Sequence, residues 1–112
     1  MNPKKPTIIV KEEIYKKAIE TWGENLQLGM LIEECAELIK AVNKFWRKKD
    51  YDSINSLAEE CADVEIMIEQ LKIMNKDVFC KKVDDFKEVK LIKLRNLLFD
   101  NNQVSKNDNH RR

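Results

Sequence analysis

Apolar residues recur every three or four positions along most of this 112-residue chain. That spacing collects them on one face of an α-helix, whereas a half-buried strand would alternate apolar and polar residues. Four helices are predicted on this basis: one from about Val10 to Trp22, one from about Glu24 to Lys48, one between residues 52 and 75, and one from about Val78 to Phe99.

Short polar breaks separate the predicted helices. Gly23 is placed to end the first helix as a C-cap, and Asp50 or Asp52 can cap the N-terminus of the third. Asn75–Asp77 predicts a further turn. Because short connections make successive helices antiparallel neighbours, the fold class is all-α, an antiparallel four-helix bundle.

The predicted second and third helices have wide apolar faces. The second carries Leu28, Leu31, Ile32, Cys35, Leu38, Ile39, Val42, Phe45 and Trp46, and the third carries Ile54, Leu57, Ala58, Cys61, Val64, Ile68 and Leu71. One neighbouring helix covers less than this. We therefore expect a second copy of the chain to bury the excess and complete the bundle, as a dimer or a tetramer.

An eight-residue stretch occurs twice in these two helices. Residues 31–38 (LIEECAEL) return 26 positions later as residues 57–64 (LAEECADV), with five identities. Each copy holds two acids three residues apart, which lie on one face of a helix. The pairs are Glu34 with Glu37 and Glu60 with Asp63. Packed together, the two helices could bring four carboxylates to one divalent cation.

The acids are predicted to lie beside the apolar stripe, partly removed from water. At about 100° per residue, Glu34 and Glu37 share a face with Met30 and Ala41, and the second pair shares one with Met67 and Met74. Glu33 and Glu59 point further towards solvent. Paired acids are also ordinary on a charged helix surface, so a solvated face remains the alternative interpretation.

The ligand types narrow the choice of metal. Carboxylate oxygens suit Mg²⁺, Mn²⁺ or Ca²⁺, and Mg²⁺ is the best match. A di-iron bundle needs Glu-x-x-His pairs, but the only histidine is His110 near the C-terminus. Zinc is disfavoured because no His and Cys set converges.

Composition and charge indicate the domain organisation, the kinds of partner and the cellular compartment. With 43% hydrophobic and 37% charged residues, the chain reads as one charge-coated globular domain over residues 10–99, with a flexible lead-in at 1–9 and a disordered tail at 100–112. A net charge of +1 gives no reason to expect nucleic acid or a membrane as a partner. Three cysteines without metal-ligand spacing, and no long apolar run, predict a cytoplasmic protein.

The two acid pairs and their surroundings resemble the MazG-like all-α nucleoside triphosphate pyrophosphohydrolases. The pattern E-x-x-E, 22 residues, then E-x-x-D is preceded here by WGENLQ at residues 22–27, which is similar to the family's W-G-x-x-x-Q. The resemblance covers about Ile14 to Leu98. It implies a Mg²⁺-dependent enzyme, with Mn²⁺ as a possible substitute, that hydrolyses nucleoside or deoxynucleoside triphosphates to a monophosphate and pyrophosphate.

The resemblance also assigns roles to individual residues. Glu34, Glu37, Glu60 and Asp63 match the family's metal ligands, and Glu33 matches a Glu that would orient or deprotonate the attacking water. The candidate substrate-binding residues are Trp22, Gln27, Lys44, Lys90 and Lys93. Lys93 stands where Arg is common in relatives, so it would make a point-charge contact with phosphate.

The candidate substrate-binding residues could instead have purely structural roles. Trp22 could plug the core at the end of the first helix, and the lysines could lie over core edges with their ammonium groups in water. For the whole chain, the alternative is a non-catalytic helical dimerisation module or a protein that senses nucleotide without hydrolysing it.

Overall fold

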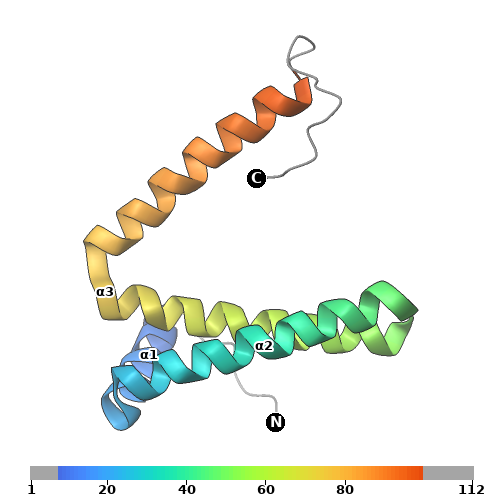
Figure 1. Ribbon diagram of the computed structural model, residues 1–112. Coiled ribbons are helices and arrows are strands. Elements are labelled where there is room, and N and C mark those ends of the chain that lie inside the picture. The colour runs from blue at the N-terminus through green and yellow to red at the C-terminus, as the bar shows by residue number, and fades with distance from the viewer. Residues whose placement is uncertain (1–7, 100–112) are drawn as a thin grey trace. The chain divides into compact units, whose positions relative to one another are not determined.

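The computed structural model describes residues 8–99, and none of them lies in a strand. Three helices follow one another: α1 (Ile8–Trp22), α2 (Glu24–Lys48) and α3 (Tyr51–Phe99) (Figure 1). The all-α prediction is confirmed. The first helix begins at Ile8 rather than Val10. The rest of the predicted lead-in and the predicted tail lie outside the described residues.

Gly23 separates α1 from α2, as its sequence position predicted. Its φ is +87°, a backbone conformation that costs glycine little and other residues more. The Gly23 N–H donates to the Ile19 carbonyl over 2.7 Å, and the Gly23 carbonyl accepts from the Gln27 N–H over 3.2 Å. The same residue therefore ends one helix and opens the next.

In the turn between α2 and α3, Lys49 ends the first helix and Asp50 caps the second. Lys49 adopts a left-handed conformation (φ 50°), and its N–H donates to the Phe45 carbonyl over 2.8 Å, which closes α2. Asp50 then caps α3: its carboxylate accepts the Ser53 N–H over 2.9 Å, and Ser53 Oγ accepts the Asp50 N–H over 3.1 Å. This reciprocal capping box confirms Asp50 as the N-cap. The Ser53 hydrogen bonds lower the pKa of Asp50.

The assigned helix α3 contains one break, at Lys76 (φ 55°, ψ −147°). The break coincides with the turn predicted at Asn75–Asp77. It divides the chain into two compact units, residues 1–75 and 76–112. The first unit holds α1, α2 and residues 51–75 of α3, and the described part of the second is a single helical segment ending at Phe99. The four-helix bundle and its completion by another chain stay predictions.

Within the first unit, α2 and residues 51–75 of α3 form an antiparallel helical hairpin (Figure 1). One set of side chains packs between the two helices. Its most buried members are Gln27, Ala41, Ser53, Val64, Met67 and Gln70, and Leu31, Leu38, Phe45, Leu57 and Leu71 are half-buried beside them.

Much of the predicted core is exposed in this chain. The exposed members are Leu28, Ile32, Cys35, Ile39, Val42 and Trp46 of α2, and Ile54, Ala58, Cys61 and Ile68 of α3, and their burial by a second copy stays a prediction. These residues follow the buried or half-buried positions by one residue, which turns them about 100° away from the neighbouring helix. A single helical partner cannot cover both sets. None of the described helices is long and apolar enough to span a membrane.

Candidate metal centre

Three acids from two helices converge in the middle of the hairpin. Glu34 of α2 and Glu60 and Asp63 of α3 each offer a carboxylate oxygen, and these oxygens all lie within 4.8 Å of one another. All three residues are half-buried. Glu34 and Glu60 hold equivalent positions in the two copies of the eight-residue stretch. Because α2 and α3 are antiparallel, each copy presents its acids to the other.

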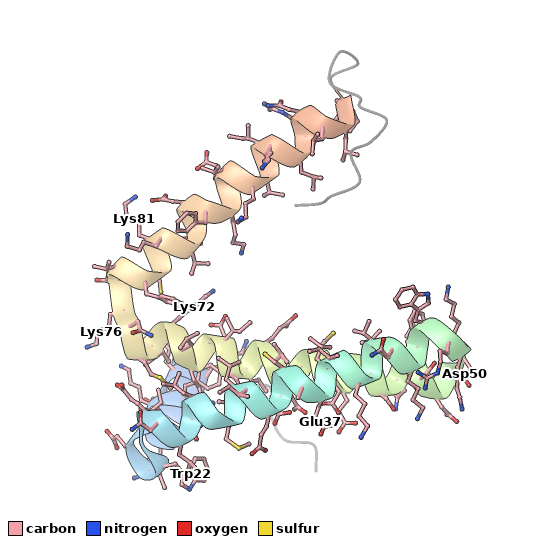
Figure 2. All side chains as sticks on the ribbon, in the orientation of Figure 1. Trp22, Glu37, Asp50, Lys72, Lys76 and Lys81 are labelled. Carbon is pink, nitrogen blue, oxygen red and sulfur yellow. The ribbon has the colours of Figure 1, made fainter. Side chains whose placement is uncertain are left out.

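Glu37, the fourth predicted ligand, lies at the edge of this cluster. It is exposed and belongs to the part of α2 near the middle of the hairpin (Figure 2). Its charge nevertheless contributes to the raised pKa of both Glu34 and Glu60. The structure therefore brings three predicted ligands together and leaves Glu37 at the rim.

The cluster is electrostatically unfavourable when its acids are ionised. Burial is the largest cause of a raised pKa at Glu34, followed by the charges of Asp63, Glu33 and Glu37. At Glu60 burial again comes first, followed by Asp63 and Glu37. Glu33 and Glu59 are exposed, as expected from their helical phase. A bound cation would offset the repulsion at both half-buried acids.

The donor set fits a hard divalent cation. Two oxygens bound to one Mg²⁺ ion lie at most about 4.2 Å apart, and on Ca²⁺ about 5 Å. The 4.8 Å spread of the three carboxylate oxygens therefore needs only small side-chain rotations for Mg²⁺. Glu37 and water molecules can complete the coordination, since Mg²⁺ usually keeps several waters.

Gln27, a predicted substrate-binding residue, is buried and hydrogen-bonded within the protein. Its Nε2 donates to Gln70 Oε1 over 2.8 Å, and Gln70 Nε2 contacts Met67 Sδ at 3.8 Å. The pair clamps the start of α2 to residues 67–70 of α3. Gln70 was missed by sequence reasoning, although a neutral polar residue one helical turn beyond Met67 was the available signal.

Replacing Gln27 by Leu should lower the free energy of unfolding by about 1–3 kcal/mol, because the buried Gln70 amide would lose its partner. The double variant Gln27→Leu, Gln70→Leu should recover part of this loss, since no polar group is then left unpaired. Urea denaturation of both variants measures the effect. A single variant as stable as the parent protein would show that Gln27 is not a structural clamp.

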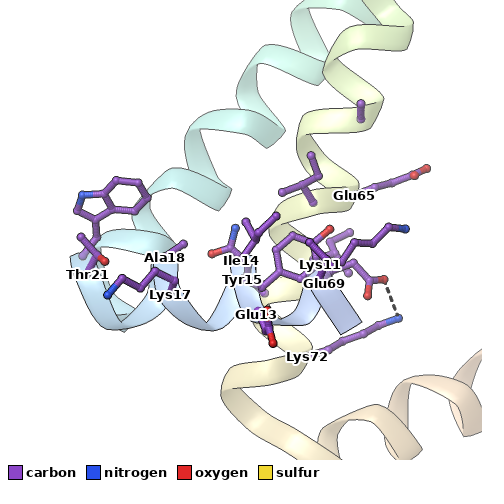
Figure 3. A pocket seen from close by; sticks show the side chains of 16 residues that line it. Lys11, Glu13, Ile14, Tyr15, Lys17, Ala18, Thr21, Glu65, Glu69 and Lys72 are labelled. Atoms are coloured by element: carbon purple, nitrogen blue, oxygen red, sulfur yellow. Dashed lines mark ion pairs between the residues drawn. The ribbon is translucent and has the colours of Figure 1, made fainter. Parts of the chain in front are cut away.

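Trp22 lies at the end of α1, where it lines an open groove between α1 and residues 62–72 of α3 (Figure 3). Its side chain is 57% exposed, so the interpretation of Trp22 as a core plug is wrong. The groove's apolar wall includes Ile14, Tyr15 and Ala18. The four candidate metal ligands are not among the described residues that line it.

The three candidate phosphate-binding lysines are all exposed. Lys44 is exposed on α2, two turns beyond Glu37. Lys90 and Lys93 are exposed and belong to the second unit. Their roles stay predictions.

Comparisons with protein-family models, with curated protein sequences and with solved structures found no match to this chain.

Proposed function

We propose that this protein is a Mg²⁺-dependent nucleoside triphosphate pyrophosphohydrolase. The observation that carries the proposal is the convergence of Glu34, Glu60 and Asp63, whose carboxylate oxygens lie within 4.8 Å of one another. The raised pKa values of Glu34 and Glu60 support it, because ionised acids held this close favour a cation. The spacing of the two acid pairs and the WGENLQ stretch, which resemble MazG-like enzymes, supply the reaction class.

The proposal assigns separate roles in metal binding, water activation and substrate binding to individual residues. Glu34, Glu60 and Asp63, with Glu37 at the rim, hold Mg²⁺, which would neutralise phosphate charge and lower the pKa of a bound water. Glu33 is exposed next to the cluster, and orients the attacking water or takes its proton. Trp22 offers an exposed ring on which a base could stack, and Lys44, Lys90 and Lys93 supply cations for phosphate oxygens.

We also infer that the enzyme works as a homodimer or tetramer in the cytoplasm. The exposed apolar residues of α2 and α3 support self-association. Cys35, Cys61 and Cys80 form no disulfide in the described part of the chain, which fits a reducing compartment.

The test is a substrate panel. Purified protein is incubated with Mg²⁺ and each common NTP and dNTP, and with methylated and oxidised nucleotides, and pyrophosphate and nucleoside monophosphate are measured. The proposal expects equal amounts of both products from at least one nucleotide and none in the presence of a chelator. Absence of pyrophosphate from every nucleotide would overturn it.

The exposed apolar residues of the hairpin also favour a second candidate, a non-catalytic helical dimerisation module. That candidate expects a melting temperature that does not respond to millimolar Mg²⁺. A protein that senses nucleotide would instead bind it in a Mg²⁺-dependent manner without releasing pyrophosphate.

A further inference from the structure

An open groove separates α1 from residues 62–72 of α3, and both of its walls are largely apolar (Figure 3). The wall on α1 includes Ile14 and Trp22, which are 54% and 57% exposed. The wall on α3 includes Ile66 and Ile68, which are 43% and 38% exposed. Because removal of apolar surface from water is favourable, two facing apolar walls favour a state in which they meet.

The charged residues that line the groove are complementary between its two walls. They are Lys11, Glu13 and Lys17 on α1, and Glu65, Glu69 and Lys72 on α3. The α1 wall thus holds one more cation than acid, and the α3 wall one more acid than cation. With the groove open, Glu69 pairs with Lys72 of its own helix over 3.7 Å, and both side chains are partly exposed. Exposed pairs of this kind contribute little, so exchange of partners on closing costs little.

A single residue, Gly23, joins α1 to α2. Its φ of 87° and ψ of 156° are accessible to glycine and strained for other residues. The last hydrogen bond of α1 runs from the Gly23 N–H to the Ile19 carbonyl, and the first of α2 runs from the Gln27 N–H to the Gly23 carbonyl. Rotation about φ and ψ of Gly23 takes place between these two bonds. The first helix can therefore turn without breaking either of them.

The start of α2, on the other side of Gly23, is anchored. Gln27 and Gln70 are 4% and 5% exposed, and Gln27 Nε2 donates to Gln70 Oε1 over 2.8 Å. This buried pair holds α2 against α3 only one helical turn after Gly23. A rotation at Gly23 therefore moves α1 and leaves the hairpin of α2 and residues 51–75 in place.

We propose that α1 is a lid that turns about Gly23 and closes on residues 62–72 of α3. The groove in Figure 3 is the open state of this lid. In the closed state the apolar walls meet, and Gly23 leaves the backbone conformation that only glycine adopts without strain. Trp22 ends α1 and moves with it. The position of the lid therefore decides whether the Trp22 ring is offered to a ligand or covered by the protein.

The experiment measures the distance between α1 and the hairpin in the full chain. Nitroxide labels are attached at Glu12→Cys and Glu59→Cys, which are exposed positions outside the groove, after replacement of the three native cysteines by Ser. Pulsed electron paramagnetic resonance gives the distribution of label distances, with labelled chains diluted in excess unlabelled chain so that each distance lies within one molecule. Glu12 is about 16 Å along the helix from Gly23, which makes a turn of the lid visible. We expect two populations in the parent chain, one for each position of the lid.

Gly23→Ala tests the joint without touching the walls. Among the described residues, apart from the neighbours in the chain, no atom lies within 4 Å of the place of the added Cβ, so the change acts through the backbone. It should lower the open population relative to the closed one by about 5–150-fold, because the open conformation strains alanine by about 1–3 kcal/mol. The matched control is Gly29→Ala within α2, where the added Cβ also has room and φ is not positive. This control should keep the ratio of the parent chain.

Ile66→Glu tests the closed state from the opposite wall. Ile66 is 43% exposed with the lid open, so the open state tolerates a glutamate, whereas closing would bury its charge against α1. The closed population should fall at least about tenfold. Ile54→Glu is the matched control, because Ile54 is 48% exposed on the same helix and lies outside the groove. It should leave the ratio unchanged.

Three results would overturn the proposal: a single distance in the parent chain, a ratio that Ile66→Glu does not change, or equal effects of Gly23→Ala and Gly29→Ala. The parent chain and the Ile66→Glu variant decide the matter even where Gly23→Ala fails to fold. None of these measurements involves metal or nucleotide, and the lid therefore stands or falls separately from the proposed function.

Discussion

Replacing Glu60 by Gln is expected to lower Mg²⁺-dependent pyrophosphate release by about 100-fold or more. Glu60 is half-buried, and it offers a carboxylate oxygen within 4.8 Å of those of Glu34 and Asp63. Burial and the charges of Asp63, Glu37 and Glu34 raise its pKa. An amide of the same shape keeps one oxygen but removes the negative charge. Substitutions that only touch the partners of metal ligands already cost about 10–100-fold, and loss of a ligand should cost more.

The neighbouring acid provides a matched control for this variant. Glu59 is exposed and lies outside the group of three converging acids, so Glu59→Gln removes the same charge from the same helix without removing a ligand. Its kcat/KM should stay within about threefold of the parent value, consistent with an exposed charge of small effect. Equal losses in both variants would mean that the general negative charge of α3 matters and that no metal is held at Glu60.

Adding Mg²⁺ to the metal-free protein, or lowering its pH, should in each case stabilise it through Glu34 and Glu60. The pKa values of Glu34 and Glu60 are raised in the folded state, so folding favours their protonated forms. Their contribution is present below the unfolded pKa of 4.5 and is lost as pH rises through the folded values. Without metal, in the presence of a chelator, the melting temperature should therefore rise as pH falls from 7 towards 4.5. At pH 7, Mg²⁺ at 100 times its Kd should add about 2.7 kcal/mol.

The double variant Glu34→Gln, Glu60→Gln separates this effect from general acid stabilisation. At pH 7 without metal it should melt at a higher temperature than the parent, because two repelling charges are gone. Its melting temperature should change less between pH 7 and 4.5 and should not respond to Mg²⁺. Asp50 acts in the opposite sense, since its pKa is lowered and its contribution is lost only below about pH 3.8. A Mg²⁺ response that survives in the double variant would place the cation elsewhere.

Local chemistry predicted the helices and their ends well. The helical periodicity gave α1, α2 and the two segments of α3, and Gly23 and Asp50 act at the ends where their conformational and hydrogen-bonding preferences place them. The turn at Asn75–Asp77 was also anticipated. The positive φ of Lys76 in this turn was not anticipated, because lysine carries no signal for that conformation.

The site was predicted from the repeat, whereas the core was predicted only in part. Equal phase in two copies of a motif was enough to bring Glu34, Glu60 and Asp63 together once the helices packed antiparallel. Periodicity cannot say which partner covers an apolar face: Ile39 belongs to the predicted apolar stripe of α2 and is exposed within the single chain. Gln70 was missed because its burial depends on the arrival of Gln27 from a distant part of the chain.

The fixed order of acid, then cysteine, in each copy of the repeat constrains how the length of this chain can vary. Glu34 and Cys35, like Glu60 and Cys61, are adjacent in sequence but lie on different sides of their helices, since the two acids are half-buried at the packed face and the two cysteines are exposed. One residue inserted within either helix would turn everything after it by about 100° and exchange the two sides. Lys49 and Asp50, where α2 is closed and α3 is capped independently, form the one place between the two copies where insertions and deletions would leave both sides intact.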